Sequence, residues 1–87
     1  MKSFNMEIIT PVQTHAPREI VFLDVPSERG RLTVLANHEP FICSLTGGKV
    51  RIKTQQEEEN WSVSTGTMTV APEMVTLLVR EAEEENG

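Results

Sequence analysis

The feature that most limits the fold is a series of short segments in which apolar and polar residues alternate. The clearest is Gly48–Thr54, where Val50 and Ile52 alternate with lysine and arginine. This is the period of a β-strand with one buried face. A polar stretch containing Glu57–Glu59 follows, and the alternation resumes at Trp61–Thr65. We interpret the pair as a β-hairpin whose glutamate-rich tip lies in solvent.

Further segments of this kind recur along the chain, at residues 6–10, 19–25, 31–35, 41–45, 67–70 and 74–79, with proline or glycine near most of their ends. Short strands with turn signals every ~8–12 residues are typical of all-β sandwiches and barrels. We therefore predict a flattened β-sandwich or barrel of about 8–10 short strands. We expect a turn at Gly47–Gly48. Gly66 is expected to be a glycine at a strand junction, where substitution by valine would destabilise the fold by about 1 kcal/mol or more if the position needs a positive φ.

The length of 87 residues allows one domain. We assign residues 1–80 to this domain. Residues 81–87 are rich in glutamate, and like charges three and four positions apart would destabilise a helix there. They are expected to form an acidic, flexible tail. No linker and no convincing internal repeat divides the chain.

The composition excludes several classes of protein. The net charge is −5 and there is no tyrosine, whereas a nucleic-acid-binding surface needs a basic stripe, usually with aromatic residues. Cys43 is the single cysteine, so an intrachain disulfide is impossible, which fits a reducing compartment. No signal-peptide pattern and no apolar stretch of about 18 residues occurs. Any membrane association is therefore expected to come through a partner.

Motifs for chemistry are equally scarce. Gly47–Lys49 is the nearest fragment to a phosphate-binding loop, but the upstream glycine and the hydroxyl residue are missing. One cysteine and two histidines without ligand spacing do not predict a metal site. Cys43 lies in an apolar run, where packing is the favoured role over nucleophilic catalysis with His38 or His15, and His15 is expected to be exposed. We predict no catalytic residue, no metal and no cofactor.

The order of these segments over residues 5–80 resembles the N-terminal β-sandwich domain of the epsilon subunit of F-type ATP synthases, called delta in mitochondria. The matching segments are Met6–Pro11, Val25–Ser27, Gly30–Phe41, Gly47–Ile52 and Ser64–Leu78.

Four departures from that family pattern stand out. Thr33 replaces a glycine, and Ala36–Asn37 replaces Pro-Gly; asparagine tolerates positive φ, so the turn is expected to survive at Asn37. Arg31 stands where the family usually has an acidic residue. The helical hairpin that follows the sandwich in typical bacterial members is also absent from the sequence. If the sequence is complete, the inhibitory switch built on that hairpin is not expected here.

The resemblance implies a non-catalytic subunit of the central stalk, or rotor, that links the gamma subunit to the membrane c-ring and couples ion flow to ATP synthesis. It also implies a location on the cytoplasmic face of the bacterial inner membrane, as part of F1. The implied gamma-subunit interface is Thr10, His38, Ile42 and Cys43, and the implied c-ring interface is Glu28, Arg29, Gly30 and Arg31.

Simpler roles remain open for several of these residues. His38 could form a hydrogen bond within its own loop, Cys43 could belong wholly to the core, and the turn at Glu28–Arg31 could be only a solvated hairpin end.

Two other functions are weighed against the stalk role. A stand-alone sandwich that binds a small ligand or a carbohydrate would expose a platform of aromatic rings, but the alternation of Trp61 with Val63 points the indole inward. A small jelly-roll hydrolase would need histidines and carboxylates gathered at one cavity. The coupling ion, H⁺ or Na⁺, would be a property of the ring.

Overall fold

The computed structural model describes residues 2–85 and contains eight β-strands. The strands are β1 (Phe4–Ile9), β2 (Thr14–Ile20), β3 (Phe22–Ser27), β4 (Gly30–Val34), β5 (Phe41–Lys53), β6 (Glu58–Val70), β7 (Val75–Val79) and β8 (Ala82–Glu85). The all-β class predicted from the alternation is confirmed. Within residues 2–85 no helix is long and apolar enough to cross a membrane.

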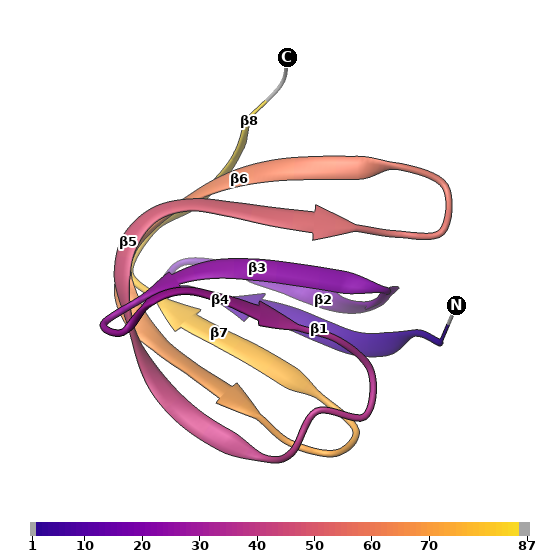
Figure 1. Ribbon diagram of the computed structural model, residues 1–87. Coiled ribbons are helices and arrows are strands. Elements are labelled where there is room, and N and C mark those ends of the chain that lie inside the picture. The colour runs from indigo at the N-terminus through magenta and orange to yellow at the C-terminus, as the bar shows by residue number, and fades with distance from the viewer. Residues whose placement is uncertain (1, 86–87) are drawn as a thin grey trace.

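One sheet, folded over on itself, makes the two layers of the sandwich (Figure 1). Its strand order is β2-β1-β7-β6-β5-β3-β4, and β8 pairs with the first part of β6. The long strands β5 and β6 curve together from one layer into the other (Figure 1). The first layer therefore holds β2, β1, β7 and residues 66–70 and 41–45, and the second holds β4, β3, β8 and residues 48–53 and 58–63.

The expected turn at Gly47–Gly48 is wrong. Both glycines lie inside β5, which pairs with β6 on either side of them. Their φ angles are 86° and 133°, values that residues with a Cβ rarely adopt. The glycine pair therefore bends a continuous strand between the layers, because it can take up the sharp local change of direction that would otherwise break the ladder.

The core lies between the layers and consists of the inward-facing residues of both. Its fully buried large side chains are Met6, Ile8, Ile20, Leu23, Ile52, Met68 and Leu77. Trp61 is 7% exposed, which confirms the inward direction predicted from its alternation with Val63.

Residues 19–25 do not form one strand. The chain leaves β2 at Ile20 and starts β3 at Phe22, and the Val21 amide donates to the Lys53 carbonyl at 2.7 Å. Pro26 lies inside β3, where the register with β5 shifts between Asp24 and Ser27. An irregularity of this kind is where a strand tolerates a residue without an N–H.

The C-terminal segment differs from the expected flexible tail. Ala82–Glu85 form β8, which pairs antiparallel with Asn60–Val63 of β6. The backbone of β6 offers hydrogen-bonding partners that the sequence pattern of the segment itself does not reveal, and Ala82 packs against the core. Residues 86–87 of the proposed tail, and Met1, lie outside the described residues.

Gly66 is needed for a reason other than the expected one. Its φ is not positive. A Cβ at this position would collide with the Leu78 carbonyl oxygen and would lie 2.7 Å from Val79 Cγ1. The glycine therefore allows β7 to approach β6 closely at the place where β6 bends between the layers.

Candidate protein-interaction surface

The β3–β4 hairpin ends in a tight turn that presents two charged side chains. The Ser27 hydroxyl donates to the Gly30 carbonyl at 2.8 Å and accepts from the Arg29 amide at 3.2 Å. Gly30 has a φ of 101°, and the Glu28 amide donates to the Ser44 carbonyl of β5 at 3.1 Å. The backbone of the turn is thus fixed on both sides, while Glu28 and Arg29 are exposed.

Arg31 behaves differently from its neighbours in the turn. Its Nη2 donates to Asp24 Oδ2 at 2.9 Å, and its Nη1 donates to the Lys49 carbonyl at 2.9 Å. The guanidinium thus links Asp24 of β3 to Lys49 of β5 on the outer face of the sheet. Among the four residues proposed for the c-ring interface, Glu28 and Arg29 supply the side-chain charges that face outward from the turn.

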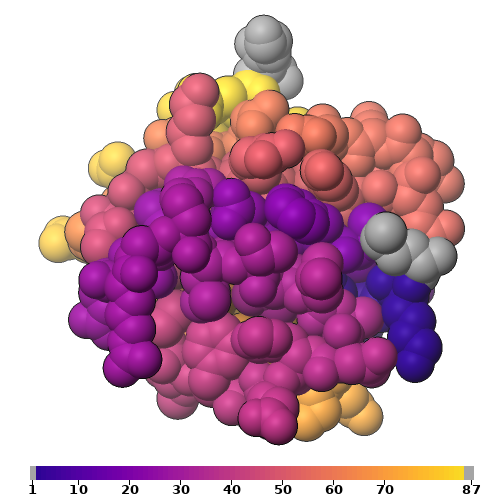
Figure 2. Space-filling model, in the orientation of Figure 1, coloured from indigo at the N-terminus to yellow at the C-terminus, as the bar shows by residue number. Residues whose placement is uncertain are grey.

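A hollow of about 330 Å³ lies beside this turn. It is lined by Ser27, Glu28, Arg29, Leu32, His38, Phe41, Ile42 and Cys43. In the space-filling view, the hairpin and the segment that leads from it into β5, coloured purple to magenta, cover much of the lower part of the face shown (Figure 2). The hollow therefore joins residues of both implied interfaces in one surface.

The loop before β5 shapes one wall of the hollow. Asn37 has a φ of 71°, so the turn survives with asparagine in place of glycine, as predicted. The His38 amide donates to the Leu35 carbonyl at 3.3 Å, and the His38 ring meets the Phe41 ring edge-on with centroids 4.9 Å apart. The imidazole is held by packing against Phe41 but remains exposed.

Ile42 and Cys43 complete the hollow from opposite faces of β5. Ile42 is 71% exposed, an unusual value for a large aliphatic residue within a strand. Cys43 is half-buried and packs against the core, and desolvation raises the pKa of its thiol, with a further contribution from Glu28. A neutral thiol suits packing and not nucleophilic attack.

Thr10 lies apart from the other proposed gamma-interface residues. It is buried at the end of β1, where its hydroxyl donates to the Gln13 carbonyl and accepts from the Gln13 amide, both at 3.0 Å. Thr10 closes the β1–β2 turn and does not line the hollow. The structure therefore brings together His38, Ile42 and Cys43, but not Thr10.

The sequence analysis did not predict a partly buried ion pair on another side of the sandwich. Glu59 is 8% exposed, so the prediction that it belongs to a solvated tip is wrong. Its carboxylate accepts from both terminal nitrogens of Arg18, at 2.8 and 2.6 Å, and from Trp61 Nε1 at 3.0 Å. The alternation of Glu59 with Trp61 and Val63 was a signal for this inward direction.

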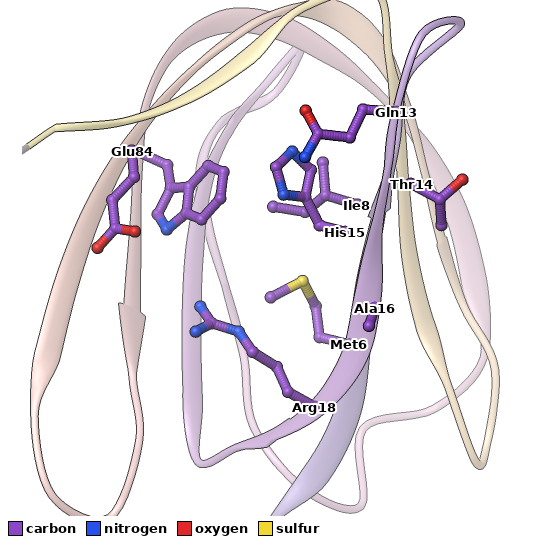
Figure 3. A pocket seen from close by; sticks show the side chains of 9 residues that line it. Met6, Ile8, Gln13, Thr14, His15, Ala16, Arg18 and Glu84 are labelled. Carbon is purple, nitrogen blue, oxygen red and sulfur yellow. The ribbon is translucent and has the colours of Figure 1, made fainter.

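His15 was also expected to be exposed and is half-buried. Its ring meets the Trp61 ring edge-on, with centroids 5.0 Å apart. Figure 3 shows His15 and Arg18 pointing from β2 into a hollow of about 360 Å³, where Met6 and Ile8 also point. No sequence signal identified β2, because its seven residues include a proline and several polar side chains.

The chain matches a known protein family over most of its length. The family described as "ATP synthase, Delta/Epsilon chain, beta-sandwich domain" matches residues 3–85. A Bacillus pumilus protein named "ATP synthase epsilon chain" is 36% identical over 95% of this chain and 63% of its own length. A Propionigenium modestum protein named "ATP synthase epsilon chain, sodium ion specific" is 30% identical over 94% of this chain and 60% of its own length.

A solved structure has the same fold. A chain of the Euglena gracilis mitochondrial ATP synthase superposes with a TM-score of 0.89 at 16% identity, over 94% of this chain and 53% of that one. The present chain thus spans less than two-thirds of the length of these relatives. By its sequence match and its sandwich, the chain belongs to the delta/epsilon family of ATP synthase chains.

Proposed function

We propose that the chain is a non-catalytic central-stalk subunit that joins the gamma subunit to the c-ring of an F-type ATP synthase. The observation that carries the proposal is the hollow beside β5, which combines an exposed apolar residue, Ile42, with the exposed turn residues Glu28 and Arg29. An exposed apolar side chain rimmed by polar residues is a feature of protein-interaction sites.

The two parts of the hollow would contact different partners. Its β5 wall, with His38, Ile42 and Cys43, would contact gamma, because apolar residues dominate the centre of an interface. The turn, with Glu28 and Arg29, would contact the polar loops of the ring. Membrane association on the cytoplasmic face would follow from docking to the ring.

A sandwich suits such a coupling role. Its two layers share the long strands β5 and β6, and its core is close-packed, so a force applied at the turn is transmitted through the sheet. The carbohydrate-binding alternative loses support because the Trp61 ring is buried and its N–H is bonded to Glu59. No platform of aromatic rings is formed at that position.

The proposal is tested by reconstitution with the gamma subunit and the c-ring of the same enzyme. The double substitution Glu28→Ala/Arg29→Ala should weaken binding to the isolated c-ring at least tenfold and leave binding to gamma within twofold. A matched control is Glu73→Ala, an exposed charge in the β6–β7 turn outside the hollow. Failure of the wild-type chain to bind either partner would refute the stalk role.

A further inference from the structure

One side of the sandwich is open between the edge strand β2 of the first layer and strands β6 and β8 of the second. The ladder connects β2 to β1 only, and β8 to β6 only. The hollow of about 360 Å³ described above lies at this opening. It is lined by His15 and Arg18 from β2, Trp61 from β6 and Glu84 from β8. Side chains, and not backbone hydrogen bonds, therefore span this side.

Strand β2 is itself weakly held. Arg18 pairs with Met6, and His15 pairs with Ile8. Two residues of β2 therefore lie between these pairs, where β1 has only one. The extra residue is a β-bulge at Ala16–Pro17, and Pro17 has no N–H to donate. The hydrogen-bonded pairing of β2 with β1, its only neighbouring strand among the described residues, is thus interrupted at its centre.

The bulge has a second effect on side-chain direction. In a regular strand, residues three apart point to opposite faces. Met6 and Ile8 are both buried, so their partners Arg18 and His15 both face inward, as Figure 3 shows. Without the extra residue, only one of them would reach the second layer.

Both inward side chains fasten β2 to β6. Arg18 forms the bidentate pair with Glu59, and His15 packs edge-on against Trp61, whose N–H is bonded to the same carboxylate. We propose that these four residues form a clasp that holds β2 as a strap across the open side, and that the strap can open as a unit while the rest of the sandwich stays folded.

The clasp depends on the charge of Glu59. The pKa of this carboxyl is lowered, mainly by the hydrogen bonds from Arg18 and also by the Trp61 N–H, although burial acts in the opposite direction. The other ionisable groups that line the opening are His15 on β2 and Glu84 on β8. The pKa of Arg18 is raised mainly by its hydrogen bond to Glu59, with further contributions from the charges of Glu84 and Glu57, although burial acts in the opposite direction. The strap should therefore stay closed while exposed carboxylates become protonated and open at a lower pH.

Hydrogen exchange measured peptide by peptide tests the strap directly. Arg18→Met keeps the aliphatic stem and removes the guanidinium, and should accelerate exchange of β2 amides at least tenfold, with less than threefold change in β6 and β7. Arg51→Met is the matched control, because Arg51 forms an exposed pair with Glu58 on the outer face. It should change β2 exchange less than threefold.

A uniform acceleration of all strands in Arg18→Met, or an unchanged β2, would overturn the proposal. A second measurement does not depend on that variant. Trp61 is the single tryptophan, so acrylamide quenching reports exposure of the opening. In Glu59→Gln, quenching at pH 7 should reach the higher value that the wild type shows only in acid. Equal quenching of the two proteins at pH 7 would exclude the clasp.

Discussion

Two neighbouring glutamates at the start of β6 have opposite environments. Glu59 faces inward, is 8% exposed and accepts three hydrogen bonds from Arg18 and Trp61. Glu58 faces outward, and its side chain is 43% exposed beside Arg51 at 3.2 Å and Lys53 at 4.0 Å. The comparison shows that the alternation of the strand, and not the charge of the segment, decides which carboxylate has a structural role.

The same contrast extends along the ribbon formed by β5 and β6. Its inner side carries buried apolar residues, the close approach at Gly66 and the clasp. The outer side carries charged residues on the second layer and Ile42 on the first. Inner substitutions should therefore affect stability, whereas outer substitutions should affect partners.

The largest effect is expected at Gly66. In Gly66→Val the added side chain would collide with the backbone of β7, and we expect a loss of about 3 kcal/mol or more in the free energy of unfolding. Gly30→Ala meets no atom within 4 Å but keeps a positive φ, and should cost only about 1 kcal/mol. Urea denaturation measures both. Equal losses would show that close approach at Gly66 is unimportant.

The two glutamates can be compared directly. Glu59→Ala leaves the half-buried Arg18 guanidinium and the Trp61 N–H without their shared acceptor, and should cost about 2–3 kcal/mol. Glu58→Ala removes an exposed pair and should cost less than about 1 kcal/mol. A loss at Glu58 as large as that at Glu59 would contradict the inward and outward assignment.

The free energy of unfolding should also depend on pH through Glu59. Because the pKa of Glu59 is lower in the folded chain than its ordinary value of 4.5, the unfolded chain binds more protons and stability rises with pH in this range. The stabilisation is complete above that ordinary value and is lost as pH falls through the folded value. The stability difference between wild type and Glu59→Gln should therefore be constant from pH 6 to 8 and shrink in acid. A difference that persists unchanged at pH 2 would contradict this linkage.

A smaller effect is expected at Arg31. The structure places the Arg31 guanidinium 2.9 Å from the Asp24 carboxylate. The substitution Arg31→Glu sets two carboxylates side by side on the outer face and should cost about 1 kcal/mol, as expected for replacing an exposed attraction by a repulsion. Arg31→Met, which removes the charge without the repulsion, should cost less. The two thermal midpoints are the measurement, and the reverse order would exclude this pairing.

The sequence predicted the regular parts of the fold well. Alternation located β1, β4 and β7, and most of β5 and β6. It divided β5 and β6 each into two strands, because glycines that let a strand bend or approach its neighbour closely cannot be told from turn glycines in the sequence. It could not predict β2, because an edge strand with one buried face interrupted by a bulge loses its period of two. It could not predict β8 either, since the pairing of Ala82–Glu85 depends on the free edge of β6 and not on local propensity.

The candidate surface was predictable only in part. The resemblance named His38, Ile42 and Cys43 together with Glu28 and Arg29, and the structure places these five around one hollow. It also named Thr10 and Arg31, which the structure engages in hydrogen bonds of their own. Such bonds join residues far apart in sequence or depend on turn geometry, so no linear pattern reveals them.

The affinity of this chain for the gamma subunit of the same enzyme, measured by calorimetry, tests the central claim most directly. Ile42→Lys should weaken binding at least tenfold without lowering the free energy of unfolding, because Ile42 is exposed at the centre of the proposed contact. Val12→Lys is the matched control, since Val12 is 92% exposed and lies outside the hollow, and it should bind as the wild type does. Equal affinities for the two variants would contradict the account.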